Sequence, residues 1–81
     1  MSVQMEQSVT SLEIATIAKA RLRGSSHRAL RMVLCQYHEG VLVLRGRLNS
    51  FFHAQLAQEA VARIEGVEQV VNQIEVVGRA I

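Results

Sequence analysis

Two residues have the spacing of a metal-binding pair. Cys35 and His38 are separated by two residues, a spacing at which thiolate and imidazole ligands can share a zinc ion. A structural zinc site needs four such ligands, and the chain has no second cysteine. Strand alternation also points Cys35 inward and places His38 at a turn. We therefore expect no metal site and a buried, unreactive thiol.

Catalytic machinery is not visible in the sequence. His53 falls on the inward side of a predicted helix, near its N-terminus, where burial and the helix dipole both oppose a positive charge. We expect it to be neutral and hydrogen-bonded. The chain contains no aspartate, no Ser-His-acid arrangement and no phosphate-binding loop. The sequence therefore predicts a protein that is not an enzyme, with no cofactor and no small-molecule substrate.

Composition narrows the class of partner. The chain has 81 residues, enough for one small domain, and 49% of them are hydrophobic. That share is slightly high for a domain with so much surface, so either the core is very well filled or a partner covers apolar surface. The net charge of +2 is too small for a nucleic-acid-binding arm, and we do not expect a nucleic-acid partner.

The start of the chain sets an expectation for its location. Residues 1–9 have neither a basic start nor an apolar stretch, so no secretory signal and no membrane span is visible. We expect a cytoplasmic protein, with a periplasmic or membrane-associated location still open if the chain has been trimmed. Residues 1–9 and 79–81 are predicted tails, and residues 10–78 a single domain.

The pattern of the domain predicts five elements. A T-x-x-E capping box at Thr10 starts a helix that ends at residues 24–26. Strands are predicted at 30–37 and 41–48, joined by a tight turn at residues 38–40. Asn49 or Ser50 caps a helix at 51–64 that Gly66 terminates, and a strand follows at 67–77.

This order predicts an α+β fold of the αββαβ type. It is a two-layer sandwich in which both helices cover one face of a three-stranded mixed sheet. The third strand is expected beside the second, and a place beside the first stays open. Gly46 should let a helix approach the sheet closely.

Both faces of the predicted strands carry apolar residues, although two helices can cover only one. The second face is predicted to be apolar and uncovered, which is typical of an interface. We expect it to mediate self-association, with a dimer as the first guess. Its residues are Met32, Leu34, Val41, Val43, Val71 and Val77.

Two glycine-centred blocks stand out, Gly40-x-Leu42-x-Leu44-x-Gly46 and Gly66-Val67-x-x-Val70-x-Asn72. Together they resemble the BON domain, a family named for bacterial osmotically inducible and nodulation proteins. The similarity extends from about Leu12 to Val77, and the chain resembles a stand-alone type with one copy of the domain. The resemblance implies the αββαβ fold and a non-enzymatic binding role. The matching positions, for which it implies structural roles, are Gly40, Leu42, Leu44, Gly46, Gly66, Val67, Val70, Asn72 and Val76.

The resemblance also implies two ligands. Family members are proposed to bind phospholipid at membrane surfaces, which makes peripheral binding to anionic membranes the alternative to self-association. One relative senses potassium, which makes potassium binding a third hypothesis. The residues predicted to contact lipid or a partner are Phe51, Phe52, Arg47 and Arg63.

Each of these surface features has a simpler interpretation. One of the two phenyl rings could instead fold over the edge of the sheet and join the core. A further group, Arg21, Arg23, Arg28 and Arg31, could meet phosphate groups. For these arginines a solvated basic surface is the favoured interpretation.

Overall fold

The computed structural model of the protein describes residues 11–78. The elements are α1 (Ser11–Arg23), a 3₁₀-helix η2 (Arg28–Met32), β1 (Leu34–His38), β2 (Val41–Leu48), α2 (Phe51–Val61) and β3 (Gln69–Val76). This is the predicted αββαβ order with one short 3₁₀-helix added. The predicted capping residue Thr10 and the predicted tails lie outside the described residues.

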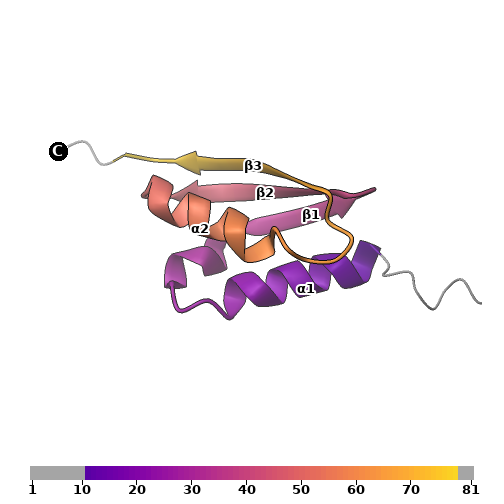
Figure 1. Ribbon diagram of the computed structural model, residues 1–81. Helices are drawn as coiled ribbons and strands as arrows, with labels where there is room; N and C mark the ends of the chain where they lie inside the picture. The colour runs from indigo at the N-terminus through magenta and orange to yellow at the C-terminus, as the bar shows by residue number, and fades with distance from the viewer. Residues whose placement is uncertain (1–10, 79–81) are drawn as a thin grey trace, which may run out of the picture.

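The sheet is three-stranded and mixed, as predicted. β1 pairs with β2 in antiparallel orientation, and β3 runs parallel to β2 on its other side. The third strand therefore lies beside the second and not beside the first. Both α-helices lie on the same side of the sheet, which leaves its other face uncovered by the described residues (Figure 1).

A two-residue turn joins β1 to β2. Glu39 and Gly40 both have positive φ, 47° and 89°, as the tight hairpin turns that match strand twist require. The Gly40 carbonyl then accepts the backbone N–H groups of Glu68 and Gln69 at 2.7 and 3.1 Å. The turn therefore also fixes where β3 begins.

The predicted first strand was too long at its start. Residues 28–32 form a 3₁₀-helix, held by bonds from Leu30 N–H to the His27 carbonyl and from Val33 N–H to the Leu30 carbonyl. Leu30 is buried in the core beneath α1 and α2. Burying this side chain there places residues 28–32 over the helical side of the sheet, out of line with β1.

Gly46 permits a close approach, but the partner differs from the prediction. An added Cβ at Gly46 would lie 3.1 Å from the carbonyl oxygen of Met32. The end of η2, and not one of the α-helices, therefore packs against the sheet backbone at this point.

The core lies between the helices and the covered face of the sheet. Leu42 and Leu44 of β2 are fully buried there. α2 is capped by Ser50, whose hydroxyl accepts the backbone N–H of His53, as one of the two predicted caps should. The helix ends at Val61, earlier than predicted, and a turn carries Ile64 back into the core.

Candidate functional site

The open face of the sheet carries most of the residues predicted for self-association. Val43 of β2 is paired with Val71 of β3, and both are half-buried. Leu34 at the start of β1 is 69% exposed. Val41 is half-buried and Val77, just after β3, is exposed.

Two observations correct the prediction of a continuous apolar face. Met32 lies in η2 and not in a strand, so it is not part of the sheet. Polar side chains share the face with the valines, because they occupy the same alternate strand positions. These polar residues are Gln36, His38, Arg45, Arg47, Gln69, Gln73 and Glu75.

Two arginines on this face are hydrogen-bonded to other residues of the same face. Arg45 donates from Nε to the Gln73 side-chain oxygen at 3.2 Å. Arg47 donates in the same way to the Glu75 carboxylate at 3.3 Å. The open face is therefore a short apolar strip crossed by neutral or paired polar groups.

The start of α2 exposes two aromatic rings. Phe51 and Phe52 are 78% and 61% exposed. The Phe52 ring lies edge-on to His27, with centroids 5.8 Å apart, and its centroid is 5.4 Å from that of His53. Ser50 fixes this region, because its hydroxyl lies 3.1 Å from Nδ1 of His53. The Phe52 ring thus contacts the His27 and His53 rings, and the rest of its surface is exposed to solvent.

Charge is divided between the two ends of the molecule. We call the end at which α1, β2 and β3 finish and α2 begins the basic aromatic end; it lies on the left in Figure 1. Its only described acidic residue is Glu75, which pairs with Arg47. The exposed arginines that lie toward it, by their positions in α1, η2 and β2, are Arg21, Arg23, Arg28, Arg31, Arg45 and Arg47.

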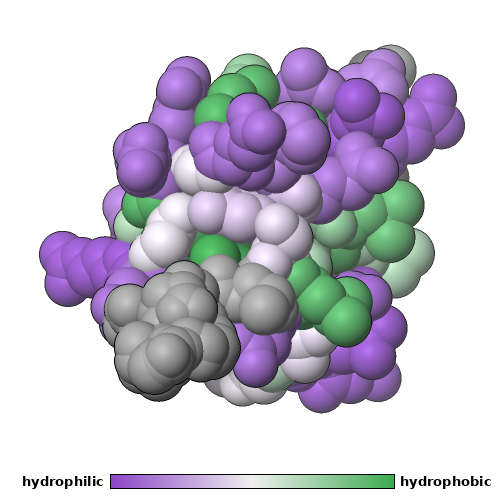
Figure 2. Space-filling view, turned by 90° about the vertical axis from the view of Figure 1, so that its right-hand side faces the viewer, coloured by the Kyte–Doolittle hydropathy of each residue, from purple (hydrophilic) through white to green (hydrophobic). Residues whose placement is uncertain are grey.

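The opposite end, at the β1–β2 turn, is called here the acidic end. Figure 2 looks onto it and shows hydrophilic residues over most of the surface, with hydrophobic residues in patches between them. The glutamates that lie toward this end, by their positions in the elements, are Glu13, Glu39, Glu59, Glu65 and Glu68.

The structure does not bring all four predicted lipid-contact residues together. Phe51, Phe52 and Arg47 lie at the basic aromatic end. Arg63 follows the other end of α2, about 16 Å away along an 11-residue helix. The length of the predicted helix alone would have separated Arg63 from the rings.

The positions shared with the BON pattern have structural roles. Gly40, Gly46 and Gly66 adopt positive φ values. The apolar positions are buried or partly buried in the core: Leu42, Leu44, Val67, Val70 and Val76.

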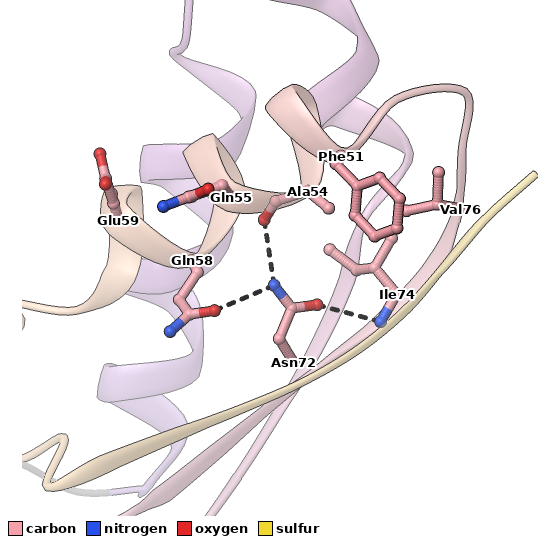
Figure 3. A pocket seen from close by; sticks show the side chains of 8 residues that line it. All are labelled: Phe51, Ala54, Gln55, Gln58, Glu59, Asn72, Ile74 and Val76. Carbon is pink, nitrogen blue, oxygen red and sulfur yellow. Dashed lines mark hydrogen bonds between the residues drawn. The ribbon is translucent and has the colours of Figure 1, made fainter.

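Asn72 links β3 to α2. Its side-chain nitrogen donates to the Ala54 carbonyl at 3.0 Å and to the Gln58 side-chain oxygen at 3.2 Å, while its oxygen accepts the backbone N–H of Ile74 at 3.0 Å (Figure 3). No local pattern predicts the bonds to Ala54 and Gln58, since they join residues distant in the sequence; only the bond to Ile74 is local.

A groove of about 330 Å³ runs between α2 and β3. Figure 3 shows the Phe51 ring beside Val76 at one end of it and Glu59 at the other, with Asn72 between them. The sequence does not predict this groove, because the groove depends on the distance between two elements that the chain connects through a loop.

Cys35 has no reactive surroundings. Its thiol is half-buried and donates weakly to the Ala15 carbonyl at 3.9 Å. Burial raises the pKa of this thiol, and Lys19 lowers it in part. Within residues 11–78 no three His, Cys, Asp or Glu side chains come together as metal ligands. Nor does this part of the chain hold a helix long and apolar enough to cross a membrane.

Comparison with known proteins agrees with the architecture. The family model of the BON domain matches residues 11–78, nearly the whole chain. No curated protein matches the sequence. The two helices on one face of a mixed sheet and the structural glycines are what the resemblance implied. The chain therefore belongs to the BON domain family.

Proposed function

We propose that this protein is a non-catalytic binding module whose basic aromatic end docks on anionic phospholipid surfaces. BON domains are generally binding modules without catalytic activity. The observation that carries the proposal is the exposure of Phe51 and Phe52, 78% and 61%, at the end where the arginines gather. Exposed aromatic rings beside cations are what an interfacial membrane contact requires.

The two kinds of side chain have different tasks in this proposal. The phenyl rings enter the boundary between headgroups and acyl chains, where they leave water. Arginine guanidinium groups form paired hydrogen bonds with lipid phosphates, and each basic residue near an anionic surface contributes about 1 kcal/mol. The glutamates at the acidic end point away from the membrane in this orientation, so the charge division orients the domain.

Vesicle flotation tests the proposal directly. We expect binding to vesicles of phosphatidylcholine with phosphatidylglycerol, weaker binding as salt is raised, and little binding to phosphatidylcholine alone. Arg28→Gln should weaken binding about fivefold, the equivalent of about 1 kcal/mol. Arg63→Gln removes the same charge at the acidic end, just after α2, and should not weaken binding. Equal binding to neutral vesicles, or equal effects of the two variants, would contradict the proposal.

A second candidate is self-association through the open face, with a second copy of the chain as partner. It is favoured by the exposure of Leu34, which lies diagonally across from the Val43–Val71 pair, on a face where two arginines are already hydrogen-bonded. Burying this strip would contribute roughly 25 cal/mol per Å² before the costs of association.

Sedimentation at micromolar concentration measures this second candidate. We expect dimers that Val43→Glu and Leu34→Glu dissociate. Leu12→Glu is the control, because Leu12 is 76% exposed on α1, away from the open face. A monomer at all concentrations, whose mass and solubility Val43→Glu leaves unchanged, would remove the candidate.

Potassium binding remains a hypothesis from the family alone. No observation on residues 11–78 favours it over the two surfaces described above. Titration calorimetry with potassium against sodium is expected to give no heat of binding, and a potassium-specific heat would revive it.

A further inference from the structure

We infer that the outer edge of β3 and the groove between β3 and α2 bind an extended peptide. The peptide carries an apolar side chain and, roughly four residues from it along the strand, a lysine or arginine. This surface is separate from the open face, and it shares Phe51 and Val76 with the basic aromatic end. The inference therefore goes beyond the proposed function and does not depend on it.

The backbone of β3 has an unpaired edge. Gln69 and Val77 donate their N–H groups to carbonyls of Gly40 and Leu48, on the β2 side. In a parallel ladder alternate residues face the same neighbour, so the odd-numbered residues of β3 face β2. The N–H and C=O groups of Val70, Asn72 and Val76 consequently point away from the sheet. Such an edge accepts the backbone of another extended segment.

The Asn72 side chain selects which extended segment fits. Its oxygen accepts the N–H of Ile74, so this outward N–H group cannot bond to another strand. The outward N–H groups of Asn72 and Val76, on either side of Ile74, stay available. In a symmetric antiparallel pair with a second copy of β3, the N–H of Ile74 would be unavailable in both strands. The ladder between them would therefore lack two hydrogen bonds. A short peptide that bonds mainly at Asn72 and Val76 loses only one. The edge therefore favours a short peptide over a second copy of the chain.

The side chains that line the groove beside this edge would contact the side chains of a bound peptide. Phe51, Ile74 and Val76 make one end of it apolar. At the other end the Glu59 carboxylate has neither an ion pair nor a hydrogen bond among residues 11–78. An apolar side chain of the peptide fits the first end, and a basic side chain complements the second.

Amide exchange measured by NMR tests the inference at single residues. The probe is a synthetic peptide of alternating valine and threonine, with one lysine four residues from a valine on the same side. We expect saturable shifts and slowed exchange at the N–H groups of Asn72, Val76 and Val70. The control is the same peptide with N-methyl groups on the edge that faces β3, which cannot donate to the strand and should cause no such changes.

Charge reversal tests the basic side chain. Glu59→Lys should weaken binding of the lysine peptide about fivefold or more and favour a glutamate version of it. Glu65→Lys is the matched control, because Glu65 is exposed beyond α2 and does not line the groove. It should change the affinity less than twofold. Vesicle binding of Glu59→Lys should not fall, which separates this test from that of the proposed function.

Three results would overturn the inference. The first is no saturable change at these amides up to millimolar peptide. The second is an equal response to the lysine, glutamate and N-methylated peptides. The third is slow exchange of the same amides without peptide together with a doubled mass, since a second copy would then occupy the edge.

Discussion

The two ends of this small domain are built in different ways. At the acidic end the backbone is tightly constrained: Glu39, Gly40 and Gly66 have positive φ, and the Tyr37 hydroxyl donates to the Gly66 carbonyl at 2.6 Å. At the basic aromatic end the last backbone hydrogen bond in the described part of the chain runs from the N–H of Val77 to the Leu48 carbonyl. The phenyl rings there extend into solvent.

The difference separates residues that hold the fold from residues that are free to bind. A left-handed backbone position or a bond between distant residues restricts substitution, because the folded state depends on it. An exposed ring contributes little to folding and is available to a ligand. Substitutions at the constrained positions of the acidic end should therefore reduce stability and leave binding intact, whereas substitutions of the exposed rings and arginines at the basic aromatic end should do the reverse.

The largest expected effect is the loss of both rings. Phe51→Ala combined with Phe52→Ala should weaken binding to anionic vesicles about thirtyfold, since two partly inserted rings contribute about 2 kcal/mol. The free energy of unfolding, measured by urea denaturation, should change by less than about 0.5 kcal/mol per substitution. A large loss of stability would mean that the rings belong to the core and that the two ends do not differ as described.

The next largest effect is expected at Gly66. Gly66→Ala should lower the free energy of unfolding by about 2 kcal/mol, because φ is 98° and an added Cβ would lie 2.5 Å from Cδ1 of the buried Ile14. Gly78→Ala, where nothing lies within 4 Å of the added carbon, is the control and should be nearly neutral. Vesicle binding of the folded Gly66 variant should match that of the native chain. A selective loss of binding would contradict the proposed difference between the two ends.

A smaller effect is expected at Tyr37. Tyr37→Phe removes the hydrogen bond to the Gly66 carbonyl and keeps the ring, so denaturation should show a loss of about 0.5–1 kcal/mol. The Gly66→Ala and Tyr37→Phe effects should not add in the double variant, since both act on the same contact. Full additivity would indicate that the acidic end is not one connected unit.

Local signals in the sequence were sufficient for most of the fold. The hairpin turn, the bounds of β2 and the Ser50 cap all follow from residues adjacent in the chain. η2 was not predicted, because its last three residues, Leu30, Arg31 and Met32, alternate apolar, polar and apolar as a strand does. Its conformation depends on the space that α1 and α2 leave for Leu30, which no local pattern contains.

The candidate sites were only partly predictable. The exposure of Phe51 and Phe52 and the position of Arg47 follow from helix and strand periodicity. The polar residues on the open face, such as Gln36 and Gln73, follow from the same strand alternation as the valines, so the mixed character of this face was predictable. The division of charge and the Asn72 link depend on which elements meet in the folded state.

The most direct test of the central claim uses a single tryptophan, because the chain contains none. Phe52→Trp places the fluorophore at the basic aromatic end, and Leu12→Trp places it on the exposed surface of α1 near the acidic end. With vesicles containing phosphatidylglycerol, we expect the emission of Phe52→Trp to shift to the blue and that of Leu12→Trp to stay unchanged. No shift for Phe52→Trp, or equal shifts for both variants, would contradict the proposal that the basic aromatic end binds the membrane.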